Sequence, residues 1–94
     1  MIVVRNSFIA KPGQAGKLAA QLKDMAAAGN LTNHRVLTDV TGDFNRVVME
    51  HEVESVAGFE EMFRKYMADP AIREKAKGYT DLWITGSREL FRIV

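Results

Sequence analysis

Hydrophobic and polar positions change their period several times along the chain, and each change marks a new element. Residues 2–10 are rich in β-branched and aromatic side chains and end at Lys11-Pro12-Gly13, which predicts a strand followed by a turn. Between residues 15 and 26, apolar side chains recur at three- and four-residue spacing, and Gly29-Asn30 supplies a stop. This second pattern predicts a helix with one narrow apolar stripe.

The middle of the chain predicts a β-hairpin. Residues 33–41 and 44–53 have strand character and flank Gly42-Asp43, a pair of residues common in hairpin turns. A two-residue loop there pairs Thr41 with Phe44, so the numbers of paired residues sum to 85. A four-residue loop about the same centre gives the same sum.

A broken helix follows the hairpin. Ser55 is a natural N-cap, and residues 56–67 show the strongest helical periodicity in the chain, with charged side chains opposite the apolar ones. Asp69-Pro70 restarts the chain, with the aspartate as a cap and the proline in the first helical turn. Apolar residues at helical spacing extend this second segment through Trp83, and residues 87–94 predict a last strand.

The order of these elements predicts the fold class. A chain of 94 residues with 47% hydrophobic and 27% charged side chains has an ordinary globular composition, and we expect residues 1–94 to form a single domain. Strand, helix, strand, strand, broken helix, strand is the α+β ferredoxin-like βαββαβ order. In that arrangement the helices cover one face of a four-stranded antiparallel sheet.

Both faces of the predicted sheet carry apolar side chains. When helices cover one face of a sheet, the other face is normally polar. The first and last strands depart from this rule: Ile2, Val4 and Phe8 oppose Val3 and Ile9, and Phe91 and Ile93 oppose Leu90 and Val94. No residues remain to cover a second apolar face, so we expect a second copy of the chain to cover it in a two-fold homodimer.

The hairpin register also distributes charges. It places Arg35 opposite Glu50 and Asp39 opposite Arg46 on one face, as two opposite-charge pairs worth about 0.2–1 kcal/mol each. The same face carries Glu52 and Arg5. We expect this face to meet the partner subunit.

Charge and cysteine content exclude several partners and sites. Lys and Arg number 13 against 12 Asp and Glu, so a net charge of +1 offers no polycation to nucleic acid or anionic lipid. Without cysteine the chain forms no disulfide, zinc–thiolate site or iron–sulfur cluster, which suits a reducing, cytoplasmic location. No apolar run approaches the roughly 20 residues that a membrane span needs, so we expect no membrane partner.

Several of these features together resemble the dimeric α/β-barrel superfamily. They are the strand–Pro-Gly–helix opening at residues 8–13, Glu52-Val53-Glu54-Ser55 before the second helix, the Asp69-Pro70 break, and the ending at residues 86–94. The superfamily includes antibiotic-biosynthesis-type monooxygenases, haem-degrading relatives, stress-responsive barrel proteins and NIPSNAP-like domains. The resemblance implies a homodimer whose two sheets close into a barrel, and a ligand pocket in each subunit between the sheet and its helices.

The resemblance to haem-degrading members can be tested by residue type. Those proteins use an Asn on the first strand, a Trp on the second helix and a His further along that helical region. Asn6 satisfies the first requirement, but residues 56–67 contain no Trp and residues 70–83 contain no His. We therefore expect no haem and no other cofactor.

Two functions remain open for the pocket. One is non-catalytic binding of a small apolar or aromatic ligand, or a role not yet defined. The other, implied by the resemblance to cofactor-independent oxygenases, is oxidation of a phenol-like or quinol-like aromatic substrate held by a few polar groups. The candidate pocket residues are Asn6, Phe8, His34, His51, Phe63, Tyr66, Tyr79, Trp83 and Glu89. For the aromatic candidates a core role is the competing interpretation, and for Glu89 a pair with an arginine across the sheet.

The predicted register brings the only two histidines together. His34 and His51 stand directly opposite each other in it, on the helix-covered face to which Asn6 also points. They form either an imidazole pair near solvent, or an acid–base or substrate contact in a pocket with Asn6 and Tyr66. The hairpin offers no third protein ligand, so we expect no metal site.

Overall fold

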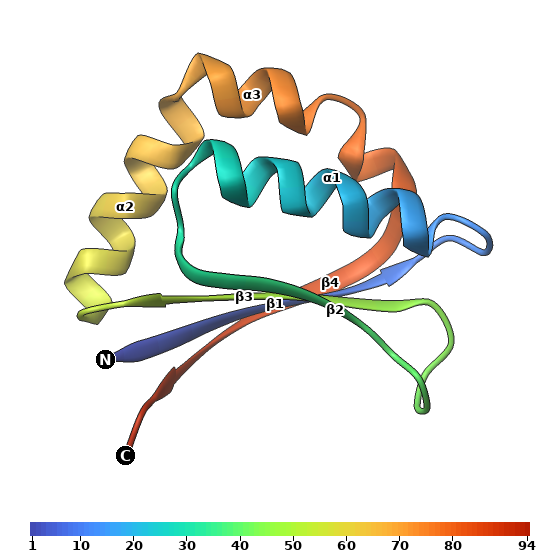
Figure 1. Cartoon of the computed structure of the whole chain (residues 1–94), viewed down its shortest axis with the longest axis horizontal. Coiled ribbons are helices and arrows are strands. Elements are labelled where there is room, and N and C mark those ends of the chain that lie inside the picture. Colours follow the sequence, from blue (N-terminus) through green and yellow to red (C-terminus); the bar gives the residue numbers. More distant parts are fainter.

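Four strands form one antiparallel sheet in the computed structural model, which describes residues 1–94. The strands are β1 (Ile2–Ala10), β2 (Thr32–Thr38), β3 (Arg46–Val53) and β4 (Trp83–Arg92), in the spatial order β2-β3-β1-β4. The helices are α1 (Ala15–Ala28), α2 (Val56–Ala68), α3 (Pro70–Ala76) and the 3-10 helix η1 (Tyr79–Leu82). All of them lie over the same face of the sheet (Figure 1). This is the α+β ferredoxin-like fold that the sequence predicts. None of the helices is long and apolar enough to cross a membrane.

Helix α1 packs tightly on the sheet through the predicted apolar stripe. Leu18 and Leu22 are completely enclosed, and they meet Val47 and Met49 of β3 in the main core. Burial of each such aliphatic side chain contributes about 1.5–3 kcal/mol, so this layer supplies much of the stability. The helix ends at Gly29, where the backbone approaches the ring of Tyr66 so closely that a Cβ would lie 2.5 Å from the ring.

Helix α2 is held differently. It starts as predicted at Ser55, whose Oγ accepts a hydrogen bond of 2.9 Å from the backbone N–H of Gly58. None of its residues is fully buried, although its amphipathic pattern is the strongest in the sequence. At its far end the Asp69 carboxylate caps α3 at the predicted break, accepting from the N–H of Ala71 at 2.9 Å. The apolar side of α2 therefore remains partly open beneath the helix.

The hairpin turn differs from the prediction, whereas its register does not. β2 ends at Thr38 and β3 begins at Arg46, so Gly42-Asp43 lies within a longer loop over residues 39–45. Beyond the strands, the N–H of Asp39 still donates to the carbonyl oxygen of Arg46 at 3.3 Å. The Asp39 carboxylate accepts from the backbone N–H of Arg46 at 3.0 Å, and the predicted pair with the Arg46 guanidinium does not form. Both strands shorten about the same centre, and the residue numbers of the pairs nearest the loop still sum to 85.

The predicted extension of the second helical segment is also wrong. α3 ends at Ala76, and Gly78 adopts a left-handed conformation with φ of 78°, which an ordinary residue seldom takes. Trp83 lies in β4 rather than in a helix, where it pairs with Ala10 of β1. The last strand therefore begins at Trp83 and not at Ser87, and it forms one edge of the sheet.

The face of the sheet away from the helices, here called the open face, carries a charge network. Arg5 Nε lies 2.6 Å from Glu50 Oε2, and Arg35 Nη2 lies 2.7 Å from Glu50 Oε1. Glu89 stands opposite Arg5 on β4, so four alternating charges cross all four strands. Burial of Glu50 opposes ionisation, but the hydrogen bonds from Arg35 and Arg5 outweigh it and hold the pKa of the carboxyl below its usual range. The predicted Arg35–Glu50 pair on one face is confirmed.

Replacement of Glu50 by Gln should destabilise the fold. The change leaves Arg5 and Arg35 without a counter-charge and removes two charge-assisted acceptors from a site that is only 5% exposed. Because both guanidinium groups reach solvent, we expect a loss of about 1–3 kcal/mol, below the range for a fully buried pair. Urea denaturation measures this change. Glu61→Gln, at an exposed pair within α2, is the control and should leave the midpoint unchanged; equal effects of the two variants would contradict the structural role of Glu50.

Candidate functional site

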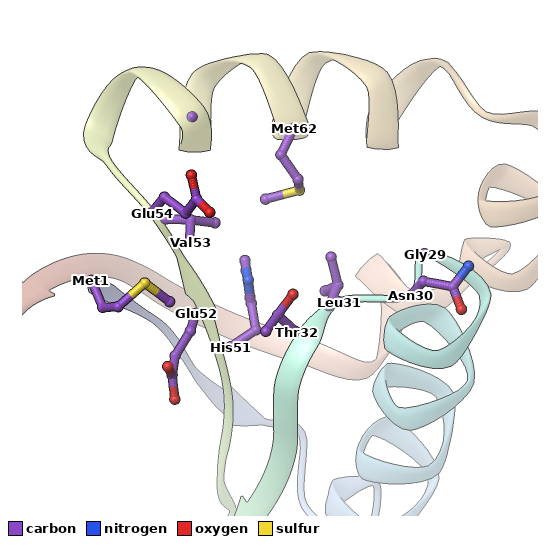
Figure 2. A pocket seen from close by; sticks show the side chains of 11 residues that line it. Met1, Gly29, Asn30, Leu31, Thr32, His51, Glu52, Val53, Glu54 and Met62 are labelled. Atoms are coloured by element: carbon purple, nitrogen blue, oxygen red, sulfur yellow. The ribbon is translucent and has the colours of Figure 1, made fainter.

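A cavity lies between α2 and the sheet. Its outer part has a volume of about 330 Å³ and is lined from the end of α1, the start of β2, the end of β3 and α2. In Figure 2 the His51 ring points up from β3 into this space, and Met62 hangs down toward it from α2. Glu52 points to the other side of its strand, whereas Glu54 lies at the rim. An inner chamber of about 40 Å³ shares Leu31, His51 and Met62 with the outer part.

Four polar side chains from four different elements line the inner chamber. Asn6 comes from β1, His51 from β3, Arg88 from β4 and Tyr66 from α2. Asn6 and His51 are only 6% and 3% exposed. Asn6 and Arg88 are direct partners in the sheet, and the Nε of Arg88 donates a hydrogen bond of 2.7 Å to Asn6 Oδ1.

Two aromatic rings of α2 form the wall beside Arg88. Phe59 and Phe63 are stacked, with ring centroids 5.6 Å apart. The guanidinium carbon of Arg88 lies 4.4 Å from the centroid of Phe63 and 5.7 Å from that of Phe59. Cation–π contacts of this kind contribute about 0.5–1 kcal/mol at partly exposed sites, so Arg88 ties α2 to the β4 edge of the sheet.

The protonation states in the chamber follow from burial. Burial, and then the positive charge of Arg88, lowers the pKa of His51, so the imidazole is neutral near pH 7. Burial, with a smaller contribution from Tyr79, raises the pKa of Tyr66 to about 12, so its phenol keeps its proton. Neither His51 Nδ1 nor the Tyr66 hydroxyl has a hydrogen-bond partner, although both atoms are buried. The chamber thus combines one cation, a neutral base and a phenol donor.

Of the predicted site residues, the structure brings Asn6, His51, Phe63 and Tyr66 together in this chamber. It does not bring His34 there. A bulge between Thr32 and Arg35, with Asn33 in a left-handed conformation at φ of 48°, breaks the predicted pairing of the two imidazoles. His34 is exposed, and its Nδ1–H donates to the carbonyl oxygen of Leu31 at 2.8 Å. The prediction that the histidines pair directly is therefore wrong.

Three other predicted residues form a separate aromatic cluster. The rings of Phe8 and Trp83 are 5.3 Å apart, and Tyr79 lies 6.5 Å from Phe8 and 6.3 Å from Trp83. This cluster packs against the core beneath α1 and does not line the cavity. Glu89 stands on the open face opposite Arg5, so it does not reach the chamber either.

Arg88 is the site residue that sequence reasoning missed. The apolar residues that assign the faces of the last strand, Leu90 to Val94, all follow Arg88 in the sequence. Side chains two apart on a strand share a face, so Arg88 belongs with Leu90 on the helix-covered side. The alternation of side chains along the last strand therefore places Arg88 on the helix-covered face from the sequence alone. No group of three or more His, Asp or Glu side chains is placed to hold a metal ion.

Comparison with known proteins establishes the fold. No protein-family model and no curated protein matches the sequence. Among solved structures, an uncharacterized NIPSNAP domain protein from Burkholderia xenovorans has a TM-score of 0.86 at 13% identity, over 100% of this chain and 95% of that one. A NIPSNAP family protein from Agrobacterium tumefaciens has a TM-score of 0.80 at 14% identity, over 99% and 85% of the two chains. A protein assigned by name to the antibiotic biosynthesis monooxygenases, from Chloroflexus aurantiacus, has a TM-score of 0.78 at 17% identity, over 99% and 92%. The chain therefore has the fold of the superfamily that its sequence resembles.

The buried neutral imidazole predicts a loss of stability in mild acid. Because the pKa of His51 is lower in the folded state than its ordinary value of 6.5, the unfolded chain binds the proton more tightly. Stability therefore falls as the pH drops below about 6.5 and continues to fall until the folded-state pKa is passed. Thermal unfolding at fixed protein concentration, from about pH 8 to about pH 5, should show this step. His51→Gln should remove it and His34→Gln should retain it; an unchanged step in His51→Gln would contradict the assignment.

Proposed function

We propose that this chain forms a homodimer through the open face of its sheet, and that the cavity beneath α2 binds a small ligand with an apolar or aromatic body. The observation that carries the binding proposal is the inner chamber. There Asn6, His51, Tyr66 and Arg88 converge from four elements under a helix that is not packed down. A pocket with mostly apolar walls and a few convergent polar groups is the usual form of a small-molecule site.

The composition of the open face supports the dimer. Leu37 of β2 and Phe91 of β4 lie on the open face and are 40% and 42% exposed. The loop between β2 and β3 and the C-terminal end both bend away from the helices, beyond this face (Figure 1). That loop carries Val40 and Phe44, which are 97% and 88% exposed. So much unpartnered apolar surface favours an interface.

The charge network on the same face supports a second copy as the partner. Arg35, Glu50, Arg5 and Glu89 alternate in sign from one edge of the sheet to the other. A second sheet turned over about a two-fold axis parallel to the strands presents the same series in reverse order. Each arginine then faces a glutamate, which makes the surface complementary to itself.

A charge placed on the open face should weaken the dimer. Leu37→Glu buries a carboxylate in the proposed interface, and we expect its dimer dissociation constant to rise at least about tenfold. Sedimentation or light scattering at micromolar concentration should show a mass twice the 10.5 kDa of one chain for the wild type, and a shift toward the monomer for the variant.

Met67→Glu is the matched control for this experiment. Met67 is an apolar residue on α2 with 53% exposure, away from the open face, and its replacement should leave the dimer intact. A wild-type protein that remains monomeric at these concentrations would refute the dimer proposal.

A second candidate function is cofactor-independent oxidation of a quinol-type or phenol-type aromatic by molecular oxygen. The neutral His51 beside the cation of Arg88 favours it. The imidazole would take a proton from the substrate, and the guanidinium would stabilise the resulting oxyanion. The substrate anion then transfers one electron to O₂, and the radical pair combines into a peroxide. The peroxide loses water, so one oxygen atom enters the substrate as a carbonyl and the other leaves as water.

Filling the outer cavity separates the two candidate functions from a purely structural role. Met62→Trp places a larger side chain opposite His51 and should abolish binding of 1-naphthol, followed by protein-detected NMR, while the dimer remains. Met67→Trp, on the exposed side of α2, should bind as the wild type does. Oxygen uptake with hydroquinone then distinguishes catalysis from binding, because only the oxygenase consumes O₂ and loses that activity in Met62→Trp. Binding of 1-naphthol that survives Met62→Trp would place the ligand outside the cavity.

A further inference from the structure

The guanidinium of Arg88 differs from the other two arginines whose side chains form contacts on the sheet. Arg5 and Arg35 both have the carboxylate of Glu50 as their counter-charge. Arg88 forms no ion pair; its hydrogen-bond acceptor is the neutral amide oxygen of Asn6, and its other neighbours are aromatic faces. The contact with Asn6 uses Nε, so the N–H groups of both Nη atoms remain available to an acceptor.

Two further polar atoms of the chamber lack partners. His51 Nδ1 and the Tyr66 hydroxyl are buried with no hydrogen bond, and each such group costs about 1–3 kcal/mol if it stays unpaired. The hydroxyl of Tyr66 keeps its proton and can donate it. A group that accepts hydrogen bonds and carries negative charge therefore satisfies both the guanidinium and the phenol at once.

We infer that the inner chamber is an anion subsite, and that the ligand of this cavity carries a carboxylate that pairs with Arg88. This inference rests on the proposed ligand-binding function of the cavity. The planar fork of a guanidinium matches the two oxygens of a carboxylate, and contact with Phe63 holds the fork in place.

The space beside the subsite limits the size of the ligand. The inner chamber, at about 40 Å³, admits a carboxylate but no ring, whereas the outer cavity, at about 330 Å³, admits an aromatic body between Leu31 and Met62. The two glutamates of the outer cavity do not face the inner chamber, where they would repel an anion. Glu52 points away from it, and Glu54 lies at the solvent-exposed rim (Figure 2). An aryl carboxylate fits this division.

Benzoate and benzamide test the inference, because they share shape and differ in charge. Titration of each into the wild-type protein at neutral pH and low salt, followed by NMR of the backbone amides, gives the two dissociation constants. We expect benzoate to bind at least about tenfold more tightly than benzamide, as expected for a charge-assisted pair. Arg88→Gln should abolish this preference, because benzoate loses its charged partner and falls to the affinity of benzamide. Arg88→Lys, which keeps the charge, should retain part of it.

Arg73→Gln is the matched control, since Arg73 is an exposed arginine on α3 that donates to the carbonyl oxygen of Met67. It should keep the full preference for benzoate. A second readout follows the His51 ring: bound benzoate should raise the pKa of this imidazole, and benzamide should not. The other charged or titratable groups near His51 are Arg88, Tyr66, His34, Glu52, Glu54 and the N-terminal amine of Met1.

The possible results separate the anion subsite from the ligand cavity. Equal binding of benzoate and benzamide, with no effect of Arg88→Gln, overturns the anion subsite and leaves the ligand cavity standing. A benzoate preference that persists in Arg88→Gln overturns the role of Arg88. If neither compound, at millimolar concentration, perturbs the residues around His51 and Met62, the anion subsite fails; if 1-naphthol also fails to bind, the ligand cavity fails with it.

Discussion

The Glu50 carboxylate accepts hydrogen bonds from arginines on both neighbouring strands, and it thereby joins β2, β3 and β1 at one point. A slip of one residue in either pairing would move an arginine to the other face and leave a buried carboxylate uncompensated. The register that results decides which side chains face the helices. Asn6 and His51 follow Arg5 and Glu50 in sequence, so the same alternation that places the charges on the open face turns the amide and the imidazole into the chamber.

The two long helices use their apolar faces in different ways. α1 encloses Leu18 and Leu22 against β3 in the main core. α2 has a stronger amphipathic pattern but no fully buried residue, because its aromatic side chains meet an arginine and a cavity instead of a complementary apolar surface. Close packing against a sheet stabilises a helix through its buried apolar contacts, so α2, which stands above a cavity, contributes less to the stability of the domain. A loss of stability of this kind is typical of functional sites in proteins.

The sheet separates two surfaces with different electrostatics. On the open face every arginine with a resolved contact has a carboxylate, and the charges alternate in a way that suits a copy of the same surface. On the helix-covered face Arg88 keeps its charge without a carboxylate, beside buried polar atoms that lack partners. The open face thus carries a complete network, in which the arginines contact a carboxylate, and the helix-covered face carries an incomplete one, in which Arg88 has none. The two networks lie on opposite faces of β1 and β3. The complete network stabilises the fold, and the incomplete one leaves buried hydrogen-bonding groups unpaired.

Sequence alone determined the elements, their order and most of the register. Periods of two and of about 3.6 residues are local properties, and the charges of Arg35 and Glu50 selected one hairpin register even though the turn itself was misplaced. Tertiary structure decided what depends on groups distant in sequence. The bulge at Asn33 separates the two histidines. Trp83 lies in β4 and not in the predicted helix, because Gly78 interrupts the helical pattern and Trp83 pairs with β1. The chamber itself exists because Arg88 comes to lie beside Asn6, 82 positions away, and under α2. No local sequence pattern predicts this contact between Arg88 and Asn6, because it depends on the antiparallel pairing of the first and last strands.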